Sequence, residues 1–191
     1  LDREGDLTLR VQAALLCEPG KGPAQIEELR DLRQTFQGGR LTPRAAKLFV
    51  DGVVEGHTAW LLDPYEDRPG FYGERLWEPK DLHQTAAALD RERFQLHFHA
   101  VGDGAVRMAL DAVAYTAALN GPRDRRPMIA HGDLISPDDL PRFFALGVIA
   151  NLQPLWFYEE RNFKKTTLPF LGNERAWRMY TILTLLDAGA S

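Results

Sequence analysis

The 191-residue chain has a single cysteine, Cys17, and no long hydrophobic run. One cysteine cannot form an internal disulfide, and the apolar neighbours Leu15 and Leu16 predict a buried thiol in a reducing compartment. No segment approaches the roughly 20 apolar residues that cross a bilayer. Residues 1–6 are too polar to begin a secretory signal peptide. The sequence therefore predicts a cytoplasmic protein with no membrane contact.

The charge balance also lacks an excess of basic residues. The chain has 23 lysines and arginines against 27 aspartates and glutamates, for a formal net charge of −4. Because no basic cluster is present, a nucleic-acid surface is not expected. The composition is 45% hydrophobic and 26% charged, which is typical of a globular domain. Small molecules are the expected partners.

What the sequence does contain is an alternation of strand and helix patterns. The expected strands are residues 7–16, residues 45–52, a strand ending at His99, a strand ending at His131, and residues 147–152. The expected helices are residues 23–36, 79–91, 103–119, 137–145 and 175–186. This order predicts an α/β fold with about five parallel βα units, in either an open doubly wound sheet or part of a barrel.

Length bears on the choice between sheet and barrel. A complete eightfold α/β barrel needs roughly 250 residues, so a barrel here implies a fragment. The chain begins without methionine and close to its first expected strand, which suggests an excised piece.

Residues 52–78 form an expected long loop without hydrophobic periodicity. A loop of that length is usually functional or disordered. Its aromatic residues favour order, because so much aromatic surface is unfavourable in water: Trp60, Tyr65, Phe71, Tyr72 and Trp77. A second expected loop contains Trp156, Phe157 and Tyr158.

Two histidines end neighbouring strands. His99 and His131 each lie where an apolar strand passes into a loop that opens a helix. In parallel α/β proteins that rim carries the active site. Imidazoles from separate βα units can converge on a divalent cation, so both residues are predicted metal ligands. His97 shares a strand face with His99 and could chelate, although a structural role is favoured for it.

Lys47 lies inside an apolar strand pattern. It could face outward between helices and extend its amine to water. Alternatively, a buried amine would have a lowered pKa and could carry carbon dioxide as a carbamate ligand of a metal. The second interpretation is favoured because Lys47 lies one βα unit before His99.

Several other residues are candidates for substrate contact. Asp51 and Glu55 follow the second expected strand, and His57 and Trp156 lie in the long loops. Asp103 opens an expected helix, where capping is its simplest role and substrate contact the alternative.

Four blocks of the sequence carry a family resemblance: residues 47–56, 97–103, 129–131 and 147–156. Together they resemble the amidohydrolase superfamily, and within it the group that includes N-substituted formamide deformylase. By this resemblance Lys47 matches the strand-four lysine, which is often carbamylated, and His99 and His131 match the histidines of strands five and six. The strand-one His-x-His pair and the strand-eight aspartate of the family have no counterpart.

The resemblance implies a single partial catalytic domain over residues 1–191, covering approximately strands three to seven of a metal-dependent (β/α)8 barrel. It implies hydrolysis of a non-peptide amide-type C–N bond by a metal-activated water, with one or two divalent ions, zinc favoured. The general-base aspartate is expected beyond Ser191. The 191 residues alone are expected to bind zinc weakly and to show no turnover, and the open sheet edges predict a homo-oligomer.

Two other classes remain open. The chain could be a non-catalytic α/β module that grips a small molecule with Trp156, Phe157 and the aromatic loop, its histidines being structural. It could also be an open flavodoxin-like regulatory domain. That domain would need acidic or phosphate-binding residues clustered at its early strand ends, which the sequence does not clearly show.

Overall fold

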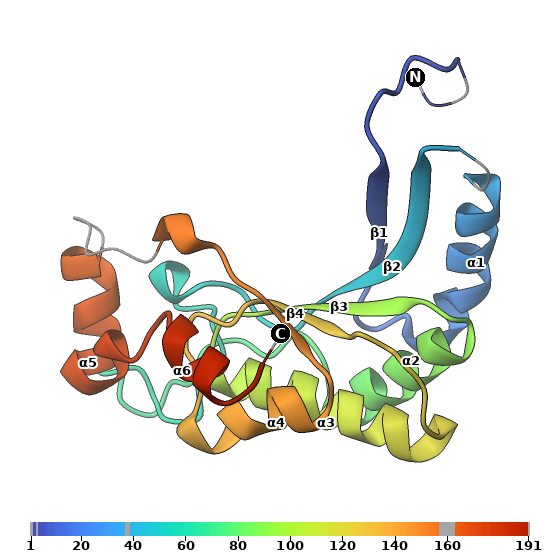
Figure 1. Cartoon of the computed structure of the whole chain (residues 1–191). Helices are drawn as coiled ribbons and strands as arrows, with labels where there is room; N and C mark the ends of the chain where they lie inside the picture. Colours follow the sequence, from blue (N-terminus) through green and yellow to red (C-terminus); the bar gives the residue numbers. More distant parts are fainter. Residues whose placement is uncertain (1, 3, 37–38, 157–162, 191) are drawn as a thin grey trace.

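The computed structural model describes residues 2, 4–36, 39–156 and 163–190 and contains one sheet of five strands (Figure 1). The strands are β1 (Val11–Cys17), β2 (Leu41–Phe49), β3 (Gln95–Ala100), β4 (Met128–His131) and β5 (Ile149–Asn151). Neighbouring strands are parallel and follow sequence order without reversal. The predicted α/β fold with five parallel βα units is confirmed. The flavodoxin-like alternative is wrong for the described strands, because it requires a reversal in strand order.

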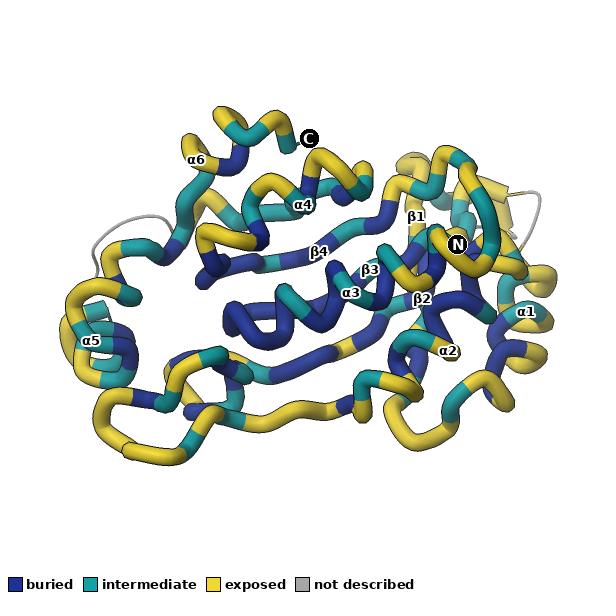
Figure 2. Tube along the Cα trace, turned by 90° about the horizontal axis from the view of Figure 1, so that it is seen from below, coloured by how far each residue is buried: buried dark blue, intermediate teal, exposed yellow. Residues whose placement is uncertain are grey.

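Helices connect the strands. They are α1 (Ile26–Thr35), α2 (Pro79–Arg91), α3 (Asp103–Asn120) and α4 (Leu140–Ala145), with short 3-10 turns η1 (Gly22–Gln25) before α1 and η3 (Pro137–Asp139) before α4. Figure 2 shows these helices against one side of the strands, with α3 buried along most of its length. No helix in the described ranges is long and apolar enough to cross a membrane.

The C-terminal segment differs from the prediction. In place of one helix over residues 175–186, the structure has a π-helical turn, η5 (Phe163–Thr167), then α5 (Leu168–Trp177) and α6 (Ile182–Asp187). Tyr180 has a φ of 60°, a left-handed conformation that ends helical propagation between α5 and α6. The apolar periodicity continues across this break, so the sequence pattern did not reveal it.

The core lies between the sheet and helices α1 to α4. Alternate strand residues such as Leu48, Phe98 and Ile129 point to the helices and are at most 1% exposed. They pack with helix residues such as Leu82 and Leu110. Since side chains alternate along a strand, their neighbours lie on the opposite face of the sheet.

That opposite face carries the chemically distinctive residues. Leu16, Lys47 and His97 are register partners across three strands, and Phe49 pairs with His99. Leu16 is 52% exposed and Phe49 is 39% exposed, so the described residues leave this part of the sheet face partly open to solvent. The sheet thus exposes a mixed apolar and basic face beside the site.

Cys17 is fully buried among the core residues, as predicted. Burial raises the pKa of its thiol to about 12, so the reactive thiolate forms far more readily in the unfolded chain. At pH 8 we expect Ellman's reagent to label the folded chain on the order of 100-fold more slowly than the chain in concentrated guanidinium chloride. Equal labelling rates in the two conditions would contradict this burial.

Candidate metal and substrate site

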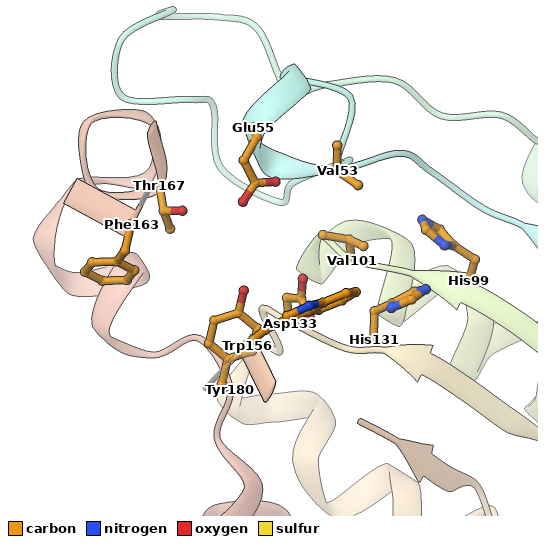
Figure 3. A pocket seen from close by; sticks show the side chains of 10 residues that line it. All are labelled: Val53, Glu55, His99, Val101, His131, Asp133, Trp156, Phe163, Thr167 and Tyr180. Atoms are coloured by element: carbon orange, nitrogen blue, oxygen red, sulfur yellow. The ribbon is translucent and has the colours of Figure 1, made fainter. Parts of the chain in front are cut away.

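His99 and His131 lie side by side at the carboxyl ends of β3 and β4 (Figure 3), with ring centroids 4.5 Å apart. The strand register pairs His131 with Ala100 rather than with His99. In a regular strand its side chain would therefore point to the opposite face. A φ of 77° at His131 turns the ring back toward His99, at a conformational cost of about 1–2 kcal/mol. The left-handed backbone of His131 therefore brings the two histidine rings together.

The hydrogen bond of His99 defines its tautomer. Its Nε2 lies 3.0 Å from the carbonyl oxygen of Gly52, which can only accept, so Nε2 carries the proton. Burial lowers the pKa of His99 to about 4, and the ring is neutral at pH 7. Nδ1 therefore carries the lone pair.

His131 has the complementary tautomer. Its Nδ1 lies 2.8 Å from Oε1 of Gln153, and Nε2 of Gln153 donates to the carbonyl of Asn151 at 3.0 Å. Because the second bond fixes the amide orientation, Oε1 accepts from Nδ1–H and Nε2 of His131 is left with its lone pair. Burial also lowers the pKa of His131. Neutral imidazoles oriented by a second hydrogen bond are the form in which histidine binds metals.

Lys47 lies on the same face of the sheet as the histidines, so the interpretation that placed it between helices is wrong. Its Nζ is 3.3 Å from Nε2 of His97 and 5.3 Å from the centroid of the Phe49 ring. Burial lowers the pKa of Lys47 to about 8, which makes the neutral amine accessible near physiological pH. The pKa of His97 falls to about 4 through burial and the charge of Lys47.

The donor set for a metal is small. In the ranges that the structure describes, no group of three or more histidine, cysteine, aspartate or glutamate side chains is arranged to hold a metal ion. The available donors are the two oriented imidazoles and the amine of Lys47. This set fits a divalent cation in its donor chemistry, and the carbamate of a lysine would add oxygen ligands.

Asp51 is 1% exposed and lies beneath the site. Its Oδ1 accepts from the backbone N–H of Val101 at 3.0 Å, and its Oδ2 accepts from those of Trp60 and Gly102 at 2.9 Å each. Burial raises the pKa of Asp51 to about 7, and the three donors oppose that rise. Asp51 joins β2, the following loop and β3 and does not line the cavity described below.

Asp103 and His57 are also placed away from the cavity. Oδ1 of Asp103 accepts from the backbone N–H of Leu62 at 2.9 Å, and Gly102, not Asp103, is the N-cap of α3. His57 is buried, contacts the rings of Tyr65 and Phe170, and places Nε2 2.9 Å from Oδ2 of Asp67. Both residues hold the loop of residues 52–78 in place.

A cavity of about 280 Å³ opens beside the histidine pair (Figure 3). Its lining residues are Val53, Glu55, His99, Val101, His131, Asp133, Trp156, Phe163, Thr167 and Tyr180. The structure thus brings the predicted residues Glu55 and Trp156 to the histidines, and the indole stacks on His131 with ring centroids 5.7 Å apart. Phe157 and Tyr158 lie outside the described residues.

Asp133 is the carboxylate of the cavity that was not among the predicted site residues. It is 8% exposed, lies two residues after His131 and lines the same cavity. Burial raises the pKa of Asp133 to about 7, and the charge of Glu55 adds to the rise. Its position in the turn that follows a strand-terminal histidine was the feature of the sequence that could have identified Asp133 as a site residue.

Comparisons with known proteins agree with this architecture. A model of the amidohydrolase family matches residues 1–191. Protein LONG AFTER FAR-RED 3 of Arabidopsis thaliana is 34% identical over 145 residues, which are 75% of this chain and 24% of that protein. The chain belongs to the amidohydrolase family.

Two solved structures share the fold. An uncharacterized metal-dependent hydrolase from Pyrococcus furiosus is 30% identical with a TM-score of 0.78, over 98% of this chain and 37% of that one. Its counterpart from Pyrococcus horikoshii is 28% identical with a TM-score of 0.79, over 97% of this chain and 35% of that one. The chain therefore spans between about a quarter and somewhat more than a third of the length of these relatives.

Proposed function

We propose that the chain supplies part of the catalytic domain of a metal-dependent hydrolase that cleaves a non-peptide amide-type C–N bond. The observation that carries this proposal is the pair of neutral imidazoles at adjacent strand ends, each oriented by a hydrogen bond. Family membership and the two Pyrococcus hydrolases support it. In this proposal residues 1–191 form one partial barrel domain, approximately strands three to seven.

Lys47, His99 and His131 would hold a divalent ion, with zinc favoured. When bound, such an ion lowers the pKa of a water molecule and polarises a carbonyl oxygen. The carbonyl of Gly52 and the amide of Gln153 keep the two rings in their binding tautomers. The indole of Trp156 stacks on the imidazole of His131. The general base would come from outside the 191 residues, so the chain alone should not turn over.

The test uses a form of the protein that spans the full length of its relatives. After reconstitution with zinc it should hydrolyse N-substituted formamides, lose that activity in a chelator, and regain it when zinc is restored. An Asp138→Asn variant, changed at an exposed carboxylate in η3, should behave as the unmodified protein. Hydrolysis that persists after complete metal removal would contradict the proposal. Saturable ligand binding without any turnover would favour the binding-module alternative.

Gln153 offers a test of the orienting hydrogen bond. We expect Gln153→Ala to reduce the zinc affinity of the chain by about 10- to 100-fold, because His131 loses the acceptor that fixes its tautomer. Competition with a chromogenic chelator measures the affinity, and nitrogen-15 NMR measures the tautomer. Gln84→Ala, at an exposed position of α2, is the matched control. An unchanged affinity in Gln153→Ala would show that Gln153 does not orient the ligand.

We also propose that the chain self-associates. β1 and β5 are the outer strands of the described sheet, and unpaired edges favour association with another chain. The exposed side chains of Leu16 and Phe49 add apolar surface beside them. Sedimentation equilibrium at micromolar concentration should give a mass above the 21.6 kDa of one chain. A single species at monomer mass would contradict this.

A further inference from the structure

The carboxylate of Asp133 is buried without a counterpart. Its Oδ1 has no hydrogen-bond partner, and among the described residues no ion pair involves this side chain. The φ of 56° at Gly132 carries the backbone into the turn that places Asp133 beside the cavity. A buried acceptor left unused is unfavourable, and native structures usually satisfy such an atom with a ligand, water or ion. In Figure 3 the carboxylate points into the cavity.

Glu55 faces the same cavity from the turn η2 (Val54–Gly56). No ion pair to it is found within the described ranges. The other titratable groups lining the cavity are the imidazoles of His99 and His131 and the phenol of Tyr180. Two carboxyl groups therefore face the cavity, and none of the described side chains that line it is a lysine or an arginine.

The remaining walls suit an organic cation. Trp156, Phe163 and Tyr180 contribute aromatic rings, and Val53 and Val101 contribute apolar surface. Aromatic faces attract ammonium and guanidinium groups most strongly where water is excluded. A volume of about 280 Å³ admits a small organic amine.

A metal ion is a poorer occupant of this part of the cavity. Asp133 and Glu55 do not combine with the histidines into a group of three or more metal-binding side chains, within the ranges described. Hard cations such as magnesium also prefer oxygen-rich sites to aromatic walls.

We propose that this cavity binds an ammonium group carried by the substrate, with Asp133 and Glu55 as its counterions and the aromatic residues around its hydrocarbon part. The inference rests on the proposed function, because it names the substrate class of that hydrolase: amides that bear a positively charged amine. The ammonium end would lie against the two carboxylates and the scissile amide beside His99 and His131.

The test is a binding measurement on the 191-residue chain in metal-free buffer, by isothermal titration calorimetry. The probes are benzylammonium and its neutral near-isostere, benzyl alcohol. We expect benzylammonium to bind at least about 10-fold more tightly, and the preference to weaken as salt is raised. Asp133→Asn and Glu55→Gln should each reduce the affinity for benzylammonium by about 10-fold or more and leave that for benzyl alcohol nearly unchanged. Asp138→Asn is the matched control and should change neither.

Equal affinity for the two probes, or no saturable binding of benzylammonium, would overturn the proposal. An unchanged affinity in both carboxylate variants would also overturn it. Because Glu55 is exposed, Glu55→Gln remains a valid test if Asp133→Asn does not fold, which thermal unfolding will show. The measurement involves neither metal nor turnover. A failure here leaves metal-dependent hydrolysis of neutral amides intact, and a failure of hydrolysis leaves the cation preference measurable.

Discussion

Replacing Asp51 with alanine should lower the free energy of unfolding by about 3–5 kcal/mol, the largest stability effect that we expect from a single polar residue of the site. The carboxylate accepts three backbone N–H groups, those of Trp60, Val101 and Gly102. Alanine leaves these donors without a partner, two of them deep in the structure, and opens a small void. Urea unfolding followed by circular dichroism measures the change.

Two further variants separate the causes. Asp51→Asn keeps the shape and one acceptor oxygen but aims an NH₂ group at backbone donors, so about half of the loss should remain. Asp138→Ala, at an exposed carboxylate, should change stability by less than about 0.5 kcal/mol. A loss under about 1 kcal/mol for Asp51→Ala would mean that water satisfies the exposed donors, and that Asp51 does not hold the strands together.

The second large effect concerns metal affinity. His99→Ala and His131→Ala should each weaken zinc binding to the chain by more than about 100-fold, because each removes one of the two oriented imidazoles of the candidate metal site. His97→Ala removes a histidine from the same sheet face and should have a much smaller effect. Since the pKa of His99 is lowered to about 4, proton competition at this ligand should weaken zinc binding only below about pH 5.

Chelator competition at several pH values gives these affinities. A similar loss of zinc affinity in His97→Ala would indicate that the metal binds nearer to Lys47 and His97, whose Nζ and Nε2 atoms lie 3.3 Å apart. Equal binding by all three variants would place zinc elsewhere on the chain.

Strand position and alternation made much of this arrangement predictable. The parallel order placed His99 and His131, which end β3 and β4, at one edge of the sheet, because the carboxyl ends of parallel strands share an edge. The period of two placed Lys47 and His97 on one face, as the register shows. Both features follow from the order and alternation of the strand patterns in the sequence.

Other parts of the site depend on tertiary structure. The left-handed backbone at His131 has no signature in its side chain, since residues other than glycine rarely adopt it. The burial of Asp133 depends on its contact with Tyr180, whose backbone N–H donates to the carbonyl of Asp133 at 2.8 Å from far along the chain. Similarly, Asp51 and Asp103 were expected near substrate, and only the folded loop shows their carboxylates bonded to backbone groups.

The loop of residues 52–78 borders the cavity yet is fastened to the scaffold. The carbonyl of Trp60 accepts from Gly104 and Ala105 at the start of α3, and the N–H groups of Trp60 and Leu62 are held by Asp51 and Asp103. Such a segment opens only when several buried hydrogen bonds break together. Its hydrogen-bonded amides should therefore exchange slowly with solvent, and the loop should act as a fixed wall of the cavity and not as a gate. Replacing the hydrogen-bonded anchors of this wall to redesign ligand selectivity would therefore lower the folding yield first, and libraries are better directed at Trp156 and Phe163 on the other side of the cavity.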